Sequence, residues 1–315
     1  MTAQLLGPGA YRIPAAQYHE DPAERPSLSA SNAHVLLSRS PRHAWVNHPR
    51  MNPKYRREHS TDFDLGNAAH AVLLGDQVSV EVIQALDWRT NAAKEARDAA
   101  RAAGKLPLLE NQYHRAKAMA TSAHVQLGVH EVGDVFSNGT PEVTLIWRDG
   151  DVWCRALLDY CPEPPEKAKA LYDYKTTSGA AHPDSLTSRL LGTGADIQAA
   201  FYRRGFKAIY GRDVAFRFVV QEIDQPHALS VVELDEGAMF VADCKVDEAL
   251  ALWSRCVREN RWPSYPARVA TIGLPQWYEN GQMQREERDE ADRQGGIDSF
   301  KMMLDWQAPI DGVNL

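Results

Sequence analysis

Two acidic residues and one lysine stand out in the middle of the chain by their spacing. Asp159 lies in the run Leu157-Leu-Asp-Tyr, and Asp173 follows fourteen residues later in Asp173-Tyr-Lys175. Both acids lie at the ends of β-rich runs, so adjacent strands would bring their carboxylates together. Residues two apart on a strand project from the same face, so Asp173 and Lys175 are expected to share one face.

Two neighbouring carboxylates repel each other unless one is protonated or a cation lies between them. A hard divalent cation suits oxygen ligands, so Mg²⁺ is expected, with Mn²⁺ able to replace it. Such a cation could bind a phosphate and acidify a water molecule, while Lys175 could hold that water or balance charge on the phosphorus. The set therefore indicates phosphodiester hydrolysis, although a single Asp at a strand end is usually only a turn residue.

The elements that must position these residues can be predicted from the pattern of the chain. Strands are expected over Glu142–Trp147, Val152–Tyr160, Ala168–Lys175, Phe216–Ile223 and Leu229–Leu234. The first two are joined by Asp149-Gly150, and Asp-Gly between two β-rich runs is typical of a hairpin.

Helices are expected before and between these strands. They cover 29–45 with an interruption at Pro41, 62–74, 90–127 divided at Pro107, 185–210 and 235–259. Ser29 is a favourable N-cap residue for the first of them. The order of elements indicates an α/β fold with a central mixed sheet flanked by helices, plus an N-terminal helical portion.

Three segments are expected along the chain. Residues 1–27 contain four prolines and are predicted to be irregular. Residues 28–268 are predicted to form one catalytic domain, and residues 269–315 a partly mobile tail rich in Gln, Asp and Arg.

The composition is that of a globular protein. The chain has 315 residues, of which 44% are hydrophobic and 24% charged. No apolar run is long enough to span a bilayer, and the first residues do not resemble a signal peptide. The four cysteines form no Cys-x-x-Cys pair, so a reduced, cytoplasmic protein without an iron–sulfur cluster is expected. The net charge of -7 is unusual for a DNA-binding protein, but binding depends on local patches.

Several segments, taken together and in order, carry a family resemblance. They are Leu28-Ser-Ala-Ser-Asn32 through His43, Phe63-Asp-Leu-Gly66-Asn-Ala-Ala-His70, Glu142, Asp159 with Asp173-Tyr-Lys175, Gln198-Ala-Ala-Phe-Tyr202, and Cys256 through Tyr265. This set resembles the RecB-like branch of the PD-(D/E)xK nuclease superfamily, and within it the phage and prophage exonucleases akin to exodeoxyribonuclease VIII. The resemblance implies a restriction-endonuclease-like core.

The resemblance also implies a role for each matching residue. The catalytic residues would be Asp159, Asp173, Lys175 and Glu142, and the metal ligands would be His70, Asp159, Asp173 and the main-chain carbonyl of Tyr174. Gln198 and Tyr202 are four apart on one helix face, and they would contact the DNA backbone or brace Lys175. The family often has glutamate where this chain has Asp173, which shortens the reach to a metal by one methylene group.

Other interpretations stay open for several of these residues. A lone helix histidine such as His70 is more often a buried, hydrogen-bonded residue, and Glu142 could be a surface residue of an edge strand. Basic residues could contact phosphates, but a run of charges is usually only solvent-exposed. The basic candidates are Arg203, Arg204 and Lys207 after Tyr202, and an earlier group of Arg42, His43, Lys54, Arg56 and Arg57.

The function expected from the resemblance is a Mg²⁺-dependent exonuclease that degrades linear double-stranded DNA from its ends. The polarity would be 5′ to 3′, and the single-stranded product would serve phage recombination. The family also implies a ring-shaped homo-oligomer and a single-strand annealing protein as partner. One alternative is an endonuclease of the same superfamily, and another is a non-catalytic DNA-end-binding or assembly protein.

Other enzyme classes lack their motifs here. The sequence has no Gly-x-x-x-x-Gly-Lys-Ser/Thr loop, so no ATP-dependent activity is expected. It has no His-Glu-x-x-His and no Gly-x-Ser-x-Gly, which argues against a zinc protease and an α/β-hydrolase.

Overall fold

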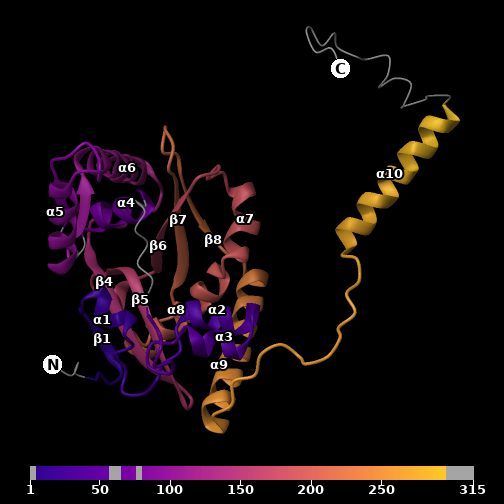
Figure 1. Ribbon diagram of the computed structural model, residues 1–315, viewed down its shortest axis with the longest axis horizontal. Helices are drawn as coiled ribbons and strands as arrows, with labels where there is room; N and C mark the ends of the chain where they lie inside the picture. Colours follow the sequence, from indigo (N-terminus) through magenta and orange to yellow (C-terminus); the bar gives the residue numbers. More distant parts are fainter. Residues whose placement is uncertain (1–4, 57–64, 76–79, 296–315) are drawn as a thin grey trace, which may run out of the picture. The chain divides into compact units, whose positions relative to one another are not determined.

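The structure is a computed structural model that describes residues 5–56, 65–75 and 80–295. The chain forms two compact units, residues 1–265 and 266–315. The first unit is built on a six-stranded sheet (Figure 1). The expected helix start near residue 62, Phe63 of the second motif and the basic residue Arg57 lie outside the described residues.

The central sheet has the strand order β1-β4-β5-β6-β7-β8. These strands are β1 Gly9–Tyr11, β4 Gly139–Asp149, β5 Val152–Pro162, β6 Ala170–Thr177, β7 Ala215–Glu222 and β8 Leu229–Glu233. The pair β6–β7 is parallel and the other pairs are antiparallel. The expected mixed sheet is therefore confirmed, and β1 is an edge strand that the sequence did not predict.

Strands β4 and β5 form the long hairpin expected around Asp149-Gly150. Asp149 pairs with Val152. Gly150 has a φ of 59°, which glycine adopts without the steric cost of a Cβ.

Strands β5 and β6 diverge, and we call this divergence the strand fork. Among the described residues, their ladder consists of the single pair Tyr160–Tyr172. Leu28 occupies the side of β5 that β6 leaves, because the Leu28 N–H donates to the Trp153 carbonyl at 2.8 Å and the Arg155 N–H donates to the Leu28 carbonyl at 2.9 Å. The fork exposes the ends of both strands to the helices on either face.

One face of the sheet is covered by α2 Ala30–Ser38, α3 Pro41–Val46, α8 Ala195–Tyr210 and α9 Glu236–Glu259 (Figure 1). The Ser29 hydroxyl caps α2 by accepting from the Asn32 N–H, and the Asp235 carboxylate caps α9 in the same way. The buried side chains on this face form the first core, which includes Phe201, Phe206, Phe218 and Trp253.

The other face is covered by α4 Leu65–Leu74 and α6 Glu110–Val129, beside α5 Asn91–Ala102. A small parallel sheet of β2 Val80–Ile83 and β3 Leu106–Leu109 lies with them. The buried side chains here form the second core, to which Tyr174 and Val219 belong. Since neighbouring Phe218 points into the first core, the two cores lie on opposite faces of β6 and β7.

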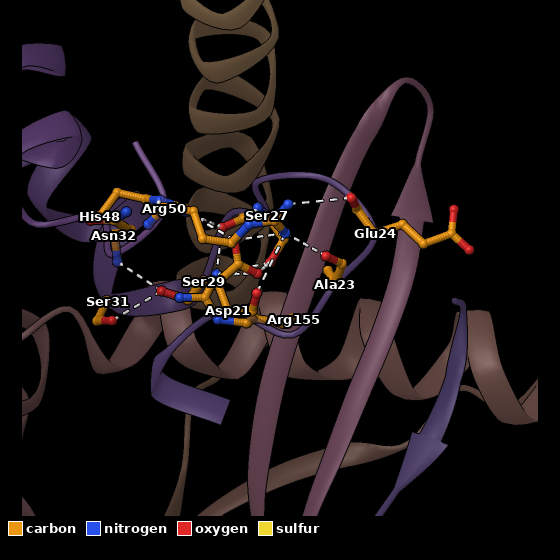
Figure 2. Close-up of polar contacts among 10 residues, drawn as sticks. All are labelled: Asp21, Ala23, Glu24, Ser27, Ser29, Ser31, Asn32, His48, Arg50 and Arg155. Carbon is orange, nitrogen blue, oxygen red and sulfur yellow. Dashed lines mark hydrogen bonds and ion pairs between the residues drawn. The ribbon is translucent and has the colours of Figure 1, made fainter. Parts of the chain in front are cut away.

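The N-terminal segment is folded against the sheet, despite the irregular course predicted for residues 1–27. It contains β1 and α1 Ala15–His19, and a buried polar cluster fastens it to β5 (Figure 2). The Asp21 carboxylate accepts from the Ser27 N–H at 2.9 Å and from the Ser27 hydroxyl at 2.5 Å. It also lies 3.2 Å from Arg155 Nη1 and 3.4 Å from His48 Nε2. These contacts hold the segment that leads to Leu28 against β5.

Two helix predictions need correction. The helix expected over 185–210 is divided into α7 Pro183–Gly192 and α8, because Gly194 has a φ of 76° and lies against His34 of α2. Pro107 does separate two helices, as expected, but it lies within strand β3. A short 3₁₀ helix, Pro165–Lys167, links β5 and β6.

The second unit contains α10 Gln276–Gln294, none of whose residues is buried. This helix falls in the segment expected to be a partly mobile tail. Among the described helices, none combines the length and apolar character needed to cross a membrane.

Candidate active site

Asp173 lies on β6 with a partner at each carboxylate oxygen. Lys175 Nζ lies 2.7 Å from Oδ2, and Gln198 Nε2 of α8 donates to Oδ1 at 2.5 Å. The expectation that Asp173 and Lys175 share one strand face is therefore confirmed. Gln198 therefore braces Asp173, where the sequence suggested Lys175. Because α8 covers the first-core face of the sheet, the Gln198 amide reaches the site from that face.

Asp159 lies near the end of β5, across the strand fork from Asp173. Its Oδ2 accepts the main-chain N–H of Tyr174 at 2.8 Å and lies 3.2 Å from His70 Nε2 of α4. The two acids are thus brought together through Tyr174, the residue between Asp173 and Lys175.

Glu142 lies on β4 directly opposite Asp159. The register runs from the pair Pro141–Tyr160 to the pair Val143–Leu158, with Glu142 and Asp159 between them. Glu142 is buried and has a φ of 52°, so the strand is locally distorted at this position. The residue is not the surface glutamate of an edge strand.

The surroundings of the two acids shift their pKa values in opposite directions. Burial raises the pKa of Asp173, and the negative charge of Asp159 raises it further, to about 6. Burial also acts to raise the pKa of Asp159, but the charges of His70 and Lys175 and the Tyr174 N–H outweigh burial and lower it. Asp159 is therefore the more acidic member of the pair, and Asp173 holds a proton more readily.

The two cationic side chains respond to the same acids. Burial acts to lower the pKa of His70, but the carboxylates of Asp159, Asp173 and Glu142 raise it to about 9. Burial likewise opposes a charged Lys175, yet Asp173 and Asp159 raise its pKa. Both side chains are accordingly cationic near neutral pH, which compensates for two buried acids.

Most of the residues predicted from the sequence meet at this position. The group consists of His70, Glu142, Asp159, Asp173, Tyr174, Lys175 and Gln198. They come from α4, β4, β5, β6 and α8, so the site lies at the strand fork, between the two cores.

Tyr202, Arg203 and Arg204, which are expected from the sequence to contact DNA, each have partners within the protein. Tyr202 is buried in the first core, where its ring packs edge-on against Phe216. Arg203 donates to the Val214 carbonyl at 2.7 Å. Arg204 is paired with the carboxylates of Asp149, Asp243 and Asp247. Contact of these side chains with DNA stays a prediction.

The earlier basic group is partly engaged as well. The Arg42 guanidinium lies 4.6 Å from the centre of the Trp45 ring, and His43 Nδ1 lies 2.6 Å from the Ser40 hydroxyl. Lys54 and Arg56 are exposed. Phosphate contact by this group stays a prediction.

Sequence reasoning missed a buried amide next to the site. Gln221 of β7 accepts a hydrogen bond from the Tyr174 hydroxyl at 2.5 Å and is completely buried. Gln221 lies in the strand Ala215–Glu222 and belongs to none of the motifs recognised in the sequence. A polar residue at a core position of a strand was the one available signal.

The site offers oxygen ligands that suit a divalent cation. Asp159 and Asp173 are close enough for one to raise the pKa of the other, and a cation between them would relieve that repulsion. Among the described residues, no three or more His, Cys, Asp and Glu side chains are already arranged to hold a metal ion. Mg²⁺ binds through one or two protein carboxylates and keeps water at its other positions. The carboxylate oxygens of Asp159 and Asp173 are therefore the type of ligand that Mg²⁺ prefers.

Residues 32–273 match the model of a family described as a PDDEXK-like domain of unknown function. The match covers well over half of the chain. The chain belongs to this PDDEXK-like family. None of the curated proteins compared with the sequence matches it.

Two solved structures resemble this PDDEXK-like protein. One is a candidate exonuclease from Eubacterium rectale, with a TM-score of 0.51 and 12% identity over 84% of this chain and 97% of the other. The second is a phage-related exonuclease from Haemophilus somnus, with a TM-score of 0.30 and 13% identity over 61% of this chain and 95% of the other. At such identities the first likeness bears on the fold alone. Together with the family match, the PDDEXK-like fold supports a nuclease.

Proposed function

We propose that this PDDEXK-like protein is a Mg²⁺-dependent exonuclease that degrades linear double-stranded DNA from its ends. The observation that carries the proposal is the pairing across the strand fork. Asp159 accepts the N–H of Tyr174, and the neighbours of Tyr174 are Asp173 and Lys175, whose charged groups are 2.7 Å apart. Two acids and a lysine around one point suit metal-assisted hydrolysis of a phosphodiester bond.

The proposed metal ligands are the carboxylates of Asp159 and Asp173 and the main-chain carbonyl of Tyr174. Glu142 and His70 stand beside them as a further ligand or as groups that orient a ligand. When bound, Mg²⁺ supplies a Lewis acid for the phosphate and acidifies water. Mn²⁺ is expected to replace it, because it also prefers oxygen ligands.

The other residues have roles that follow from their contacts. Lys175 is cationic, and it is proposed to hold the attacking water or to balance charge on the phosphate. Gln198 donates to Asp173, and it is proposed to fix the direction of that carboxylate. His70 donates to Asp159 and compensates its charge.

The finer features of the proposed activity rest on the sequence resemblance. These are 5′-to-3′ polarity, a single-stranded product used in recombination, a ring-shaped homo-oligomer and a single-strand annealing protein as partner. Double-stranded DNA ends are the proposed substrate.

The test is digestion of linear double-stranded DNA labelled at one 5′ end, with Mg²⁺ or with EDTA, beside a covalently closed plasmid. Asp173→Asn removes one charge at nearly constant shape. Asp184→Asn is the matched control, because the Asp184 side chain is almost fully exposed on α7. We expect Mg²⁺-dependent loss of linear DNA with the wild type and the control, and at least about a hundredfold slower loss with Asp173→Asn.

Each outcome assigns the activity. Loss of the label as mononucleotides in the first minutes indicates 5′-to-3′ polarity, and late loss indicates the reverse. Cutting of the closed plasmid would make the protein an endonuclease. A folded protein that binds DNA ends but cuts neither substrate would be a non-catalytic end-binding protein, and the proposal would be rejected.

A further inference from the structure

A buried amide ties three elements together behind the proposed catalytic strand. Gln221 lies on β7, where it pairs with Thr176 of β6. Its side-chain nitrogen donates to the Met119 carbonyl of α6 at 3.1 Å and to the His227 carbonyl at 3.2 Å. Its side-chain oxygen accepts from the Tyr174 hydroxyl at 2.5 Å. The amide therefore uses both of its N–H groups and its oxygen within the protein.

These contacts fix the direction of the hydrogen bond to Tyr174. Two carbonyl oxygens can only accept, so they hold the nitrogen end of Gln221 and leave its oxygen to face the ring. The Tyr174 hydroxyl must then be the donor. Burial raises the pKa of Tyr174, so the donor proton is kept throughout the neutral range.

Tyr174 transmits this constraint to the acids. Its ring is buried among Phe136 and His70, with ring centres 6.4 Å and 6.2 Å away. Its main-chain N–H donates to Asp159, and its neighbour on the strand is Asp173. A shift of the backbone at residue 174, which the anchored ring resists, would therefore change the relation of the two carboxylates.

We propose that Gln221 is a positioning residue, which holds Tyr174 so that its N–H keeps Asp159 in register with Asp173. The proposal rests on the proposed function for its catalytic consequence. Gln221 is completely buried, so it cannot touch DNA and acts through the Tyr174 hydroxyl.

The chain offers a matched control for this role. Gln126 of α6 also donates to the His227 carbonyl, at 2.8 Å, and accepts the Leu229 N–H at 3.0 Å. It joins α6 to the start of β8 as Gln221 does. Its side chain does not contact Tyr174, so Gln126→Met removes an equivalent bridge and leaves the tyrosine contact in place.

The test compares full-length Gln221→Met, Tyr174→Phe, their double variant and Gln126→Met with the wild type. Hydrogen exchange of the main-chain N–H at residue 174 is measured without metal. Mg²⁺ affinity is measured by calorimetry, and cleavage of linear DNA gives kcat. We expect faster exchange at residue 174, and Mg²⁺ affinity or kcat reduced about tenfold or more, in the first two variants. Gln126→Met should leave all three near the wild-type values.

The double variant decides whether Gln221 acts through the hydroxyl. If it does, Gln221→Met adds little to the loss already present in Tyr174→Phe. Additive losses would overturn the proposal, as would equal exchange at residue 174 in Gln221→Met and Gln126→Met. If the wild type neither binds Mg²⁺ nor cleaves DNA, the proposed function fails, and the exchange comparison still decides whether Gln221 positions residue 174.

Discussion

At the scale of single residues, Lys175 is the group that separates metal binding from chemistry. It pairs with Asp173 and is cationic, so it compensates part of the negative charge of the two acids. A cation that binds to Asp173 must compete with it.

We expect Lys175→Met to retain Mg²⁺ binding but to cleave DNA at least about a hundredfold more slowly, because the carboxylates remain and the charge that assists the reaction is lost. Calorimetry with Mg²⁺ and a cleavage time course measure the two effects. Loss of Mg²⁺ binding with unchanged folding would contradict the separate roles of lysine and acids.

His48 predicts how stability depends on pH. Its Nδ1 accepts the Arg50 N–H at 3.2 Å and its Nε2 faces the Ser27 carbonyl at 3.1 Å, which fits a neutral ring (Figure 2). Burial lowers the pKa of His48 to about 4, and the charge of Arg155 acts in the same direction.

The unfolded chain protonates this histidine near pH 6.5, whereas the folded chain does so only near pH 4. The contribution of His48 to stability is therefore complete above pH 6.5 and declines as the pH falls towards 4. Between pH 7 and pH 5 we expect a loss of about 2 kcal/mol from this residue. Urea unfolding at both pH values should show a smaller loss in His48→Gln than in the wild type. The exposed-histidine control His114→Gln should retain the wild-type loss.

Some of the site residues could be predicted from the sequence, and others could not. Asp159, Asp173 and Lys175 could be found from strand ends and spacing, and His70, Glu142 and Gln198 from their order in the chain. Gln221 could not be found, because its hydrogen bond to Tyr174 depends on the parallel pairing of β6 with β7, which no local pattern encodes. The same holds for Asp21 and its partners.

At the scale of elements, α8 packs closely against β4 because of a glycine. A Cβ on Gly205 would come within 2.7 Å of the Trp147 ring, whereas nothing lies within 4 Å of one on Gly128 of α6. Glycine usually weakens a helix interior, so the two positions should respond to alanine with opposite signs.

We expect Gly205→Ala to lower the free energy of unfolding by about 1–3 kcal/mol, because the methyl group overpacks a buried interface. We expect Gly128→Ala to raise it by up to about 1 kcal/mol. Chemical denaturation of both variants measures the difference. Equal stabilisation by Gly205→Ala and Gly128→Ala would contradict the prediction, because it would mean that α8 and β4 accommodate the extra methyl group without loss of stability.

The elements themselves were largely predictable, and the exceptions have physical causes. The β-rich runs and the Asp149-Gly150 turn predicted the strands β4 to β8, and the segment 235–259 was predicted to be the helix that is observed as α9. The break at Gly194 was missed; this glycine has a positive φ and leaves no room for a Cβ beside His34, a residue far away in the sequence. Strand β1 was hidden by prolines on either side, since its three residues gain their pairing from β4.

At the scale of the whole molecule, the first unit contains both cores and the site. None of the described residues 266–295 is buried, so this part of the second unit adds no buried residue to a core. A chain ending at Tyr265 should unfold at the same denaturant concentration as the full chain and bind Mg²⁺ equally well. A large loss of stability on truncation would contradict this division.

The strand fork has a consequence for how the protein loses activity. Asp159 is held by His70 from the helix layer of the second core, and Asp173 is held by Gln198 from the helix layer of the first. The geometry of the two acids therefore depends on both hydrophobic cores, and neither core with its helices holds both carboxylates. Partial melting of either core would separate the carboxylates before the rest of the sheet opens. Activity should therefore be lost at a lower denaturant concentration than most of the secondary structure, because partial unfolding of one core is enough to abolish it.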